Sequence, residues 1–329
     1  MSRFSLIICT YNPEPAIFQR LLNAVMKFET ASPEHEVIIV DNNSSPALSE
    51  NKSVQSFLTQ KQNSGLTVET KEGLTSARIA GIEQAKYEWI IFFDDDNEPS
   101  IDYLKTAAFA IEQHPQVGAW GPGTIKVVYT ENKDKWLETK KDLFQERNEI
   151  KTIFAKEQSW QPCYPFGTGM IIRKEIADNY ALKVRTGRYT LTDRKRKSLA
   201  SGGDVQLVFT AIETGFASGS IAGLYLNHLI DSSKANFSYL QKQQYGTASA
   251  YIKAYNQVFQ NNKIEAGKVT NFIILKKIYS LYRIHRSKLK KKDFQLLMAS
   301  KMGAMNAALF AKDKSKPILL KWYEKMINA

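Results

Sequence analysis

The chain has 329 residues, 43% of them hydrophobic and 24% charged, which is typical of a globular protein and excludes a disordered chain. Two cysteines, Cys9 and Cys163, are too few for a disulfide framework or a cysteine metal site, so we expect both to be buried and reduced, as in a cytosolic protein. The sequence begins in a strand-like segment and has no run of about 18 apolar residues, so we predict neither a signal peptide nor a membrane span.

The net charge of +12 is concentrated at the C-terminal end. Residues 263–329 hold 16 Lys and Arg against four Asp and Glu, so the preceding residues are neutral as a group. A basic region of this kind suggests an anionic partner, either membrane phosphates or nucleic acid. The first half lacks a basic and aromatic surface motif, so nucleic acid is not expected, and a nucleic-acid-binding protein using the basic tail is kept as an alternative.

The first half of the chain alternates strand and helix patterns. Short apolar runs predict strands, and apolar residues at three- and four-residue spacing predict helices. Strands are expected at residues 4–9, 36–40, 66–70 and 89–93, and helices at residues 16–28, 75–84 and 103–114. This alternation predicts βαβ units around a parallel sheet with helices on both faces.

The second half is mixed at first and then helical. Residues 119–128 predict strands with a turn at Gly121-Pro122-Gly123, and a further strand is expected at residues 170–172. Helices are expected at residues 204–212, 239–259, 269–285, 294–311 and 317–326. We therefore predict a catalytic domain over residues 1–236, with halves at 1–117 and 118–236, followed by a basic helical region over 237–329.

Polar and acidic residues follow the strands of the first half. Because ligands of such sheets bind beyond the carboxyl ends of the strands, Thr10, Tyr11, Asp41 and Asp94–Asp96 are expected on one rim. Three adjacent carboxylates raise one another's pKa unless a cation neutralises them. A divalent ion held by a carboxylate and by diphosphate oxygens would do so. The alternative is an acidic start to a helix.

Two more motifs could serve the same ligand. Tyr11, within Thr10–Glu14, could stack on a base, and Asp41 could hold a ribose hydroxyl or a base N–H; the alternative is a polar cap on each strand. Arg78 follows the glycine turn at Gly73 and could pair with a diphosphate or with the acidic triplet, the alternative being a solvated surface arginine.

Together these segments resemble a family 2 glycosyltransferase with the GT-A fold. The matching segments are residues 7–12, 37–44, 73–78, 93–96, 166–170 and 199–204. The resemblance implies an α/β nucleotide-diphospho-sugar transferase, with a Rossmann-like mixed sheet and flanking helices, plus the C-terminal helical region. It also implies transfer of a sugar from a nucleotide diphosphate, by default a UDP-sugar, to a saccharide or lipid-linked saccharide, as in bacterial polysaccharide synthesis.

The resemblance also assigns site residues. The nucleotide-sugar would be bound by Thr10, Tyr11, Glu14, Asp41, Arg78, Asp94, Asp95, Gly167, Thr168 and Gly169. Asp96 would hold Mn²⁺ or Mg²⁺, and Asp204 would be the catalytic base of an inverting displacement. The chain departs from the family at Gly203, where many members carry Glu.

His228 and Lys234 are further candidates. His228 follows an expected strand and could bind the metal or the diphosphate, the alternative being a hydrogen-bonded core histidine. Lys234 could reach the diphosphate. The basic stretch Thr186–Lys197 could be a loop that grips an anionic or diphosphate-linked acceptor, the alternative being a solvated loop.

The C-terminal region offers a membrane hypothesis. Residues 272–285 interleave apolar and aromatic residues with lysine and arginine, which is typical of a helix lying in a membrane interface. We therefore expect a cytoplasmic protein, peripheral on the inner face of the membrane, and keep a packed helical subdomain as the alternative. A nucleotidyltransferase is an alternative enzyme, although Thr10–Glu14 lacks the glycine and lysine of a phosphate loop.

Overall fold

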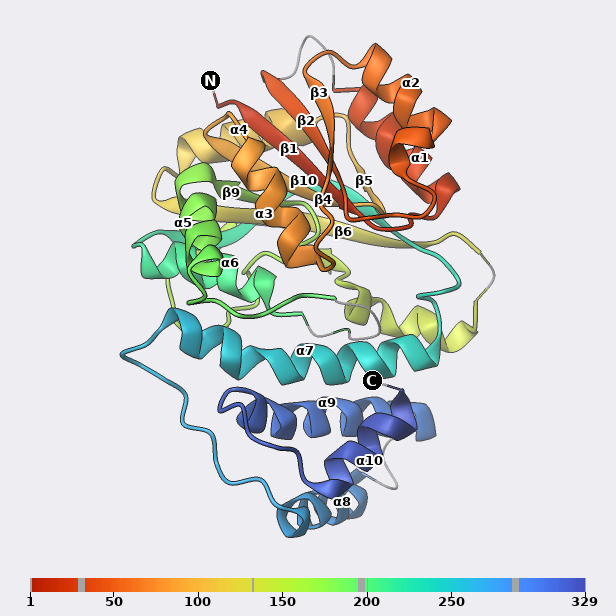
Figure 1. Ribbon diagram of the computed structural model, residues 1–329, viewed down its shortest axis with the longest axis vertical. Coiled ribbons are helices and arrows are strands. Elements are labelled where there is room, and N and C mark those ends of the chain that lie inside the picture. The colour runs from red at the N-terminus through yellow and green to blue at the C-terminus, as the bar shows by residue number, and fades with distance from the viewer. Residues whose placement is uncertain are drawn as a thin grey trace.

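The computed structural model describes residues 2–28, 33–131, 133–194, 199, 201–285 and 290–328. Its centre is one sheet in the order β3-β2-β1-β4-β9-β6-β10-β5, with β7 paired to β6 and β8 to β10 (Figure 1). The strands are β1 (Phe4–Thr10), β2 (His35–Asp41), β3 (Ser64–Val68), β4 (Trp89–Asp94), β5 (Asn97–Pro99), β6 (Val117–Tyr129), β7 (Arg147–Asn148), β8 (Ile153–Ala155), β9 (Met170–Arg173) and β10 (Ala217–Ile230).

The helices flank this sheet and then extend beyond it (Figure 1). They are α1 (Pro15–Met26), η1 (Leu48–Glu50), α2 (Lys52–Gln60), α3 (Leu74–Gln84), α4 (Tyr103–Gln113), η2 (Lys135–Phe144), α5 (Lys174–Arg185), α6 (Gly203–Glu213), α7 (Phe237–Val258), α8 (Asn271–His285), α9 (Lys291–Phe310) and α10 (Ile318–Ile327). The expected alternation of strands and helices in the first half is therefore present.

The sheet is mixed. Strands β3, β2, β1 and β4 are parallel, as the βαβ pattern predicts, while β9 runs antiparallel to both β4 and β6. Successive residues of β1 face opposite sides, so Leu6 packs in a core with Phe18 of α1 and Ile7 in a second core with Ile82 of α3. Helix α3 lies close to the sheet because Gly81 has no side chain, and a Cβ there would lie 2.4 Å from Ile7 Cγ2.

The turn predicted at Gly121-Pro122-Gly123 is wrong, because all three residues lie inside the continuous strand β6. A Cβ at Gly121 would lie 2.8 Å from Pro165 Cβ, and one at Gly123 would lie 2.4 Å from the Ile221 carbonyl oxygen. The glycines therefore admit close neighbours, and the register with β10 shifts between Ile221 and Tyr225. Helices α2 and α5 were not predicted as elements, and the strand expected before His228 is part of the longer β10.

The C-terminal helices form a layer beyond the sheet. Helix α7 begins one residue after Asn236, whose side chain accepts a hydrogen bond from the Tyr239 N–H. Helix α7 lies between the sheet and α9, α8 lies farthest out, and α10 runs between α8 and the outer side of α7 (Figure 1). A Cβ at Gly303 of α9 would lie 2.3 Å from the Tyr245 carbonyl oxygen, so α9 packs directly on α7. A division of the chain at residue 236 stays a prediction.

Among the helices that the structure describes, none is both long and apolar enough to cross a membrane. Cys9 and Cys163 are buried free thiols, as expected.

Candidate active site

The carboxyl ends of β1 and β4 meet at one rim of the sheet. Cys9 of β1 is the register partner of Asp94 of β4, which brings the residues that follow both strands together. The Thr10 hydroxyl donates a hydrogen bond of 2.6 Å to the Asp95 carboxylate. The expected convergence of Thr10 with the acidic triplet is therefore present, and it follows from the parallel pairing of these strands.

A cavity of about 250 Å³ opens at this rim. Its lining includes Thr10, Tyr11, Asn42, Gly73, Leu74, Asp94, Asp95, Asp96, Arg194 and Lys234. The Tyr11 ring is 60% exposed, so one aromatic face is available to a ligand. The cavity combines this apolar surface with four carboxylates, those of the acidic triplet and Glu72, and two cationic side chains.

The three carboxylates have different environments. Burial and the neighbouring Asp96 raise the pKa of Asp94, and burial raises the pKa of Asp95 to about 6 although Lys234 opposes that change. Burial alone would also raise the pKa of Asp96, but Lys234 and His228 hold it well below its usual range. Asp96 is therefore the carboxyl group that stays ionised most firmly.

Asp96, His228 and Lys234 lie in contact. Asp96 Oδ2 lies 2.6 Å from Lys234 Nζ and 3.4 Å from His228 Nε2. His228 Nδ1 lies 2.8 Å from the Phe144 carbonyl oxygen, which can only accept, so Nδ1 carries a proton and this bond fixes the ring with Nε2 toward Asp96. His228 lies within β10 and pairs with Asn97 of β5, so its expected place after a strand is wrong.

The residues present fit a divalent metal in part. A carboxylate oxygen and an imidazole nitrogen suit Mn²⁺, and Mg²⁺ prefers oxygen. Within the described ranges, no three His, Cys, Asp or Glu side chains come together as a metal site. Asp96 and His228 would therefore supply two ligands, and the remaining ligands would come from the substrate and water. Lys234 would have to release the carboxylate oxygen that it now holds.

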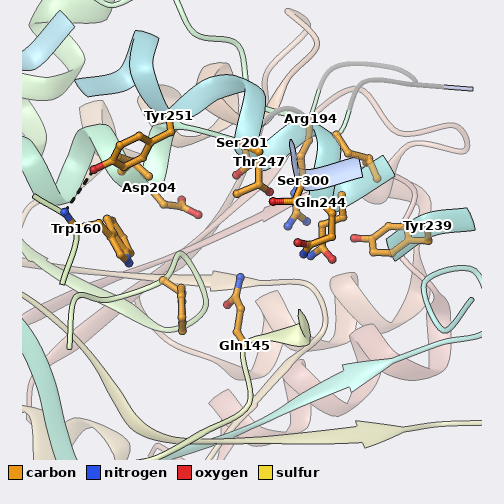
Figure 2. Close-up of a pocket in the computed structure, with 15 residues that line it drawn as sticks. Gln145, Trp160, Arg194, Ser201, Asp204, Tyr239, Gln244, Thr247, Tyr251 and Ser300 are labelled. Carbon is orange, nitrogen blue, oxygen red and sulfur yellow. Dashed lines mark hydrogen bonds between the residues drawn. The ribbon is translucent and has the colours of Figure 1, made fainter. Parts of the chain in front are cut away.

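A second cavity, of about 420 Å³, has much of its lining from helix α7 (Figure 2). Its lining includes Gln145, Trp160, Phe166, Arg194, Ser201, Asp204, Tyr239, Gln243, Gln244, Thr247, Tyr251 and Ser300. Arg194 borders both cavities, and the carboxylates of Asp94 and Asp204 both raise its pKa, along with Tyr239 as the largest influence. The two cavities therefore meet at a cationic side chain.

Asp204 lies in the first turn of α6 and reaches this second cavity. Its Oδ1 atom lies 2.5 Å from Arg78 Nη1, although the two atoms do not have hydrogen-bond geometry. The Arg78 side chain is 2% exposed, so it is not a solvated surface arginine. It forms a buried ion pair with Asp204, whereas pairing with the acidic triplet was expected. Arg78 of α3 thus places a positive charge beside Asp204, the candidate base.

Asp193 completes this group, and sequence reasoning missed it. Its carboxylate accepts hydrogen bonds from the N–H groups of Gly202 and Gly203, at 2.7 and 2.8 Å, and lies 3.7 Å from Arg78. Burial and Asp204 raise the pKa of Asp193. The sequence feature that could have revealed Asp193 is its place as the single acidic residue within the basic stretch Thr186–Lys197. Within that stretch Arg188 pairs with Glu213, and Lys195–Lys197 lie outside the described residues.

The segment Gly167–Gly169 lies directly against Asp204, the candidate base. A Cβ at Gly167 would lie 2.6 and 2.7 Å from the two carboxylate oxygens of Asp204. Thr168 is buried, and Gly169 adopts φ +68, with its carbonyl accepting a hydrogen bond of 2.6 Å from the Tyr103 hydroxyl. The three residues shape the wall beside Asp204, while Phe166 lines the cavity itself.

Two residues predicted to bind the nucleotide accept hydrogen bonds from the local backbone. The Asp41 carboxylate accepts hydrogen bonds from the N–H groups of Ser44 and Leu48, and Glu14 caps α1 by accepting from the Ile17 N–H. Neither lines either cavity. Asn42, which the sequence reasoning missed, does line the smaller cavity. Its side chain bonds to the backbone of Glu69, Lys71 and Gly73 and so fixes the loop before α3.

Comparisons with known proteins identify the fold and the family. Among solved structures, the mannosyltransferase PcManGT from Pyrobaculum calidifontis, in complex with GDP-Man and Mn²⁺, aligns with a TM-score of 0.55 at 16% identity, covering 99% of this chain and 79% of that one. TarS 1-349 of Staphylococcus aureus aligns with a TM-score of 0.49 at 16% identity, covering 94% and 90%. The first of these alignments shows the GT-A fold.

Sequence comparisons identify the family. The poly(ribitol-phosphate) beta-N-acetylglucosaminyltransferase TarS of Staphylococcus aureus is 31% identical over 118 residues, which are 35% of this chain and only 20% of TarS. The family model described as glycosyl transferase family 2 matches residues 5–181, more than half of the chain. The chain therefore belongs to glycosyl transferase family 2.

Proposed function

We propose that the protein transfers a sugar from a nucleotide diphosphate, a UDP-sugar in the first instance, to a hydroxyl group of a saccharide or lipid-linked saccharide. The observation that carries this proposal is the meeting of two cavities at Arg194. One contains the acidic triplet, and the other contains Asp204. A donor bound across the junction would present its anomeric carbon to an acceptor in the larger cavity.

The smaller cavity suits a nucleotide diphosphate. The exposed Tyr11 ring would stack on the base, Thr10 and Asp94 would lie near the ribose, and Arg194 and Lys234 would face the diphosphate. When bound at Asp96 and His228, Mn²⁺ or Mg²⁺ would neutralise negative charge that develops on the leaving diphosphate. Asp41 and Glu14 are left out of this arrangement, because neither lines the smaller cavity.

Asp204 would act as the general base. Its carboxylate takes the proton of the acceptor hydroxyl as that oxygen forms a bond to the anomeric carbon, and the bond from that carbon to the diphosphate oxygen breaks on the opposite side. A single displacement of this kind inverts the anomeric configuration. Arg78 is a positioning residue: buried beside Asp204, it holds the carboxylate at the cavity wall.

A panel of nucleotide-sugars tests the proposal. The purified protein is incubated with Mn²⁺ and each of UDP-N-acetylglucosamine, UDP-glucose, UDP-galactose and GDP-mannose, and release of the nucleoside diphosphate is measured. We expect slow hydrolysis of at least one UDP-sugar, with water as the acceptor. UDP-N-acetylglucosamine is tested first, because the relative TarS is an N-acetylglucosaminyltransferase. Failure of every donor to bind or react contradicts the proposal.

The outer C-terminal helices carry a proposed membrane surface, defined by α8 and α10. Phe272 of α8 and Trp322 of α10 are each 75% exposed, and α8 and α10 contact one another. The same helices carry Lys276, Lys277, Arg283, Lys321 and Lys325. Exposed aromatic and basic side chains side by side match an anionic lipid bilayer, which would bring the enzyme to a lipid-linked acceptor at the inner face of the cell membrane.

A further inference from the structure

The larger cavity has a lining unlike that of the smaller one. Among the described residues that line it, only Arg194 and Asp204 carry a charge. Four aromatic side chains and three glutamine amides make up much of the wall, together with three hydroxyl groups. These are Trp160, Phe166, Tyr239 and Tyr251; Gln145, Gln243 and Gln244; and Ser201, Thr247 and Ser300. Sugar rings offer apolar C–H faces and pairs of hydroxyl groups, and this wall offers the partners for both.

Two of the glutamine amides lack partners. Gln145 Oε1 and Gln243 Oε1 are buried and have no hydrogen-bond partner among the described residues. A buried amide oxygen without a donor costs free energy, so its presence calls for an explanation. Both oxygens belong to residues that line the cavity, and a ligand rich in hydroxyl groups would supply the missing donors.

The backbone fixes the place where Gln145 leaves η2. Gln145 is the C-cap of that helix, with φ +69 in the left-handed region that commonly ends a helix. Its N–H donates to the carbonyl oxygens of Lys141 and Asp142, which holds the residue at the cavity wall.

The side chains are arranged around one space. Figure 2 shows Asp204 and Gln145 pointing into the same opening from different sides, with Trp160 and Tyr239 toward its two ends. The backbone N–H of Trp160 donates a hydrogen bond of 3.4 Å to the Tyr251 hydroxyl, and the Tyr239 ring is stacked on Phe144 with an interplanar angle of 11°. A sugar hydroxyl in this opening would lie between the candidate base and the unpaired amide.

From these observations we propose that the larger cavity is the acceptor site and that it selects an uncharged sugar unit, held by the amides of Gln145 and Gln243 and by aromatic faces. The inference rests on the proposed glycosyl transfer and specifies its acceptor class. An acidic sugar is disfavoured because its carboxylate would lie in the same cavity as the carboxylate of Asp204.

Ligand-observed NMR tests the class of acceptor. Methyl glycosides of gluco, galacto and manno configuration are titrated into the full-length protein saturated with UDP and Mn²⁺, each beside the methyl glycoside of its uronic acid. We expect at least one uncharged glycoside to bind, and at least about tenfold more tightly than its uronic acid. Equal or tighter binding of the uronic acid overturns the inference, as does saturable UDP binding without binding of any glycoside.

Variants test the amides. Gln145→Gly removes the side chain and suits the left-handed backbone, and Gln243→Ala removes the second amide from helix α7. We expect each to weaken glycoside binding about five- to tenfold. Gln113→Ala, at an exposed glutamine of α4 that lines neither cavity, is the matched control and should bind as the unaltered protein does.

The results separate this inference from the proposed function. If both amide variants unfold with the same thermal midpoint as the unaltered protein and bind the glycoside equally well, the assigned site is wrong while donor binding still stands. If UDP itself fails to bind to the unaltered protein, the proposed function is wrong, and the acceptor site loses its basis.

Discussion

Arg78 Nη1 lies 2.5 Å from Asp204 Oδ1, in a contact where the arginine side chain is 2% exposed and the aspartate 19%. Arg78 also faces Asp193 at 3.7 Å, so one buried cation serves two carboxylates from different parts of the chain. The partial exposure of Asp204 is the feature that matters for chemistry, because a general base must reach an acceptor hydroxyl.

Asp204→Asn should remove the base while keeping the shape of the side chain. We expect the turnover number to fall by about 10²- to 10⁴-fold. The nucleotide should still bind, because Asp204 lies in the other cavity. Turnover is measured with a donor identified by the panel, and UDP affinity by calorimetry. Unchanged turnover would rule out the base assignment.

Gly167→Ala should disturb the same carboxylate by crowding it. The added Cβ would lie 2.6 and 2.7 Å from the Asp204 oxygens and 2.8 Å from Arg78 Nη2, so the ion pair must shift. We expect a loss of stability of about 1–3 kcal/mol and a lower turnover number. Gly65→Ala is the control, since nothing lies within 4 Å of a Cβ there. Equal effects of the two substitutions would contradict the role of Gly167.

Metal binding should depend on the nucleotide. Because Asp96 and His228 supply only two ligands, Mn²⁺ should bind weakly alone and much more tightly with UDP present. The free Mn²⁺ signal in electron paramagnetic resonance measures this directly. EDTA should stop transfer, and Asp96→Asn should abolish the effect of UDP on Mn²⁺. Full transfer after exhaustive metal removal would exclude this role for Asp96 and His228.

Asp95 should make the metal-free protein less stable as the pH rises through mild acid. Burial raises the pKa of Asp95 from 3.8 to about 6, so in that interval the folded state keeps a proton that the unfolded chain has released. Stability should therefore fall between about pH 4 and pH 6, by at most about 3 kcal/mol from this group.

The variant Asp95→Asn isolates that contribution, because asparagine does not titrate. Urea unfolding of both proteins across this pH range gives the difference in unfolding free energy. As the pH rises, the variant should become more stable relative to the unaltered protein. Parallel pH profiles for the two proteins would show that Asp95 has an ordinary pKa in the folded state.

The membrane surface of α8 and α10 should bind vesicles that contain anionic lipid. A double variant, Phe272→Ala with Trp322→Ala, should lose most co-sedimentation, and Lys276→Gln with Lys277→Gln should weaken it by about 1 kcal/mol per lysine. Phe109→Ala is the control, since Phe109 is an exposed aromatic on α4. Equal binding to uncharged vesicles, or no binding at all, would contradict an anionic bilayer as the partner.

Some of this site could be predicted because topology alone determines it. The apolar runs that end at Thr10 and Asp94 pair in parallel, so their carboxyl ends must meet whatever the rest of the chain does. The three carboxylates in a row were visible for the same reason. The mixed sheet and its helices follow from the resemblance, and the comparison with a GT-A structure confirms it.

Other parts could not be predicted, because they depend on contacts between distant residues. Nothing in the sequence near Arg78 indicates that Asp193 and Asp204 will surround it. The motif Gly121-Pro122-Gly123 has the residues of a turn, yet close neighbours on both sides keep it extended. Asp41 follows its strand at the position expected of a nucleotide ligand, but its carboxylate accepts hydrogen bonds from the N–H groups of Ser44 and Leu48 in the following loop.

Helix α9 contributes Ser300 to the larger cavity and packs through Gly303 onto α7. An enzyme shortened after α7 would keep Asp204, Arg78 and the acidic triplet, and it would open that cavity to bulk water. Water would then compete with every sugar hydroxyl for the activated donor, so such a truncated enzyme should waste nucleotide-sugar by hydrolysis instead of extending a glycan.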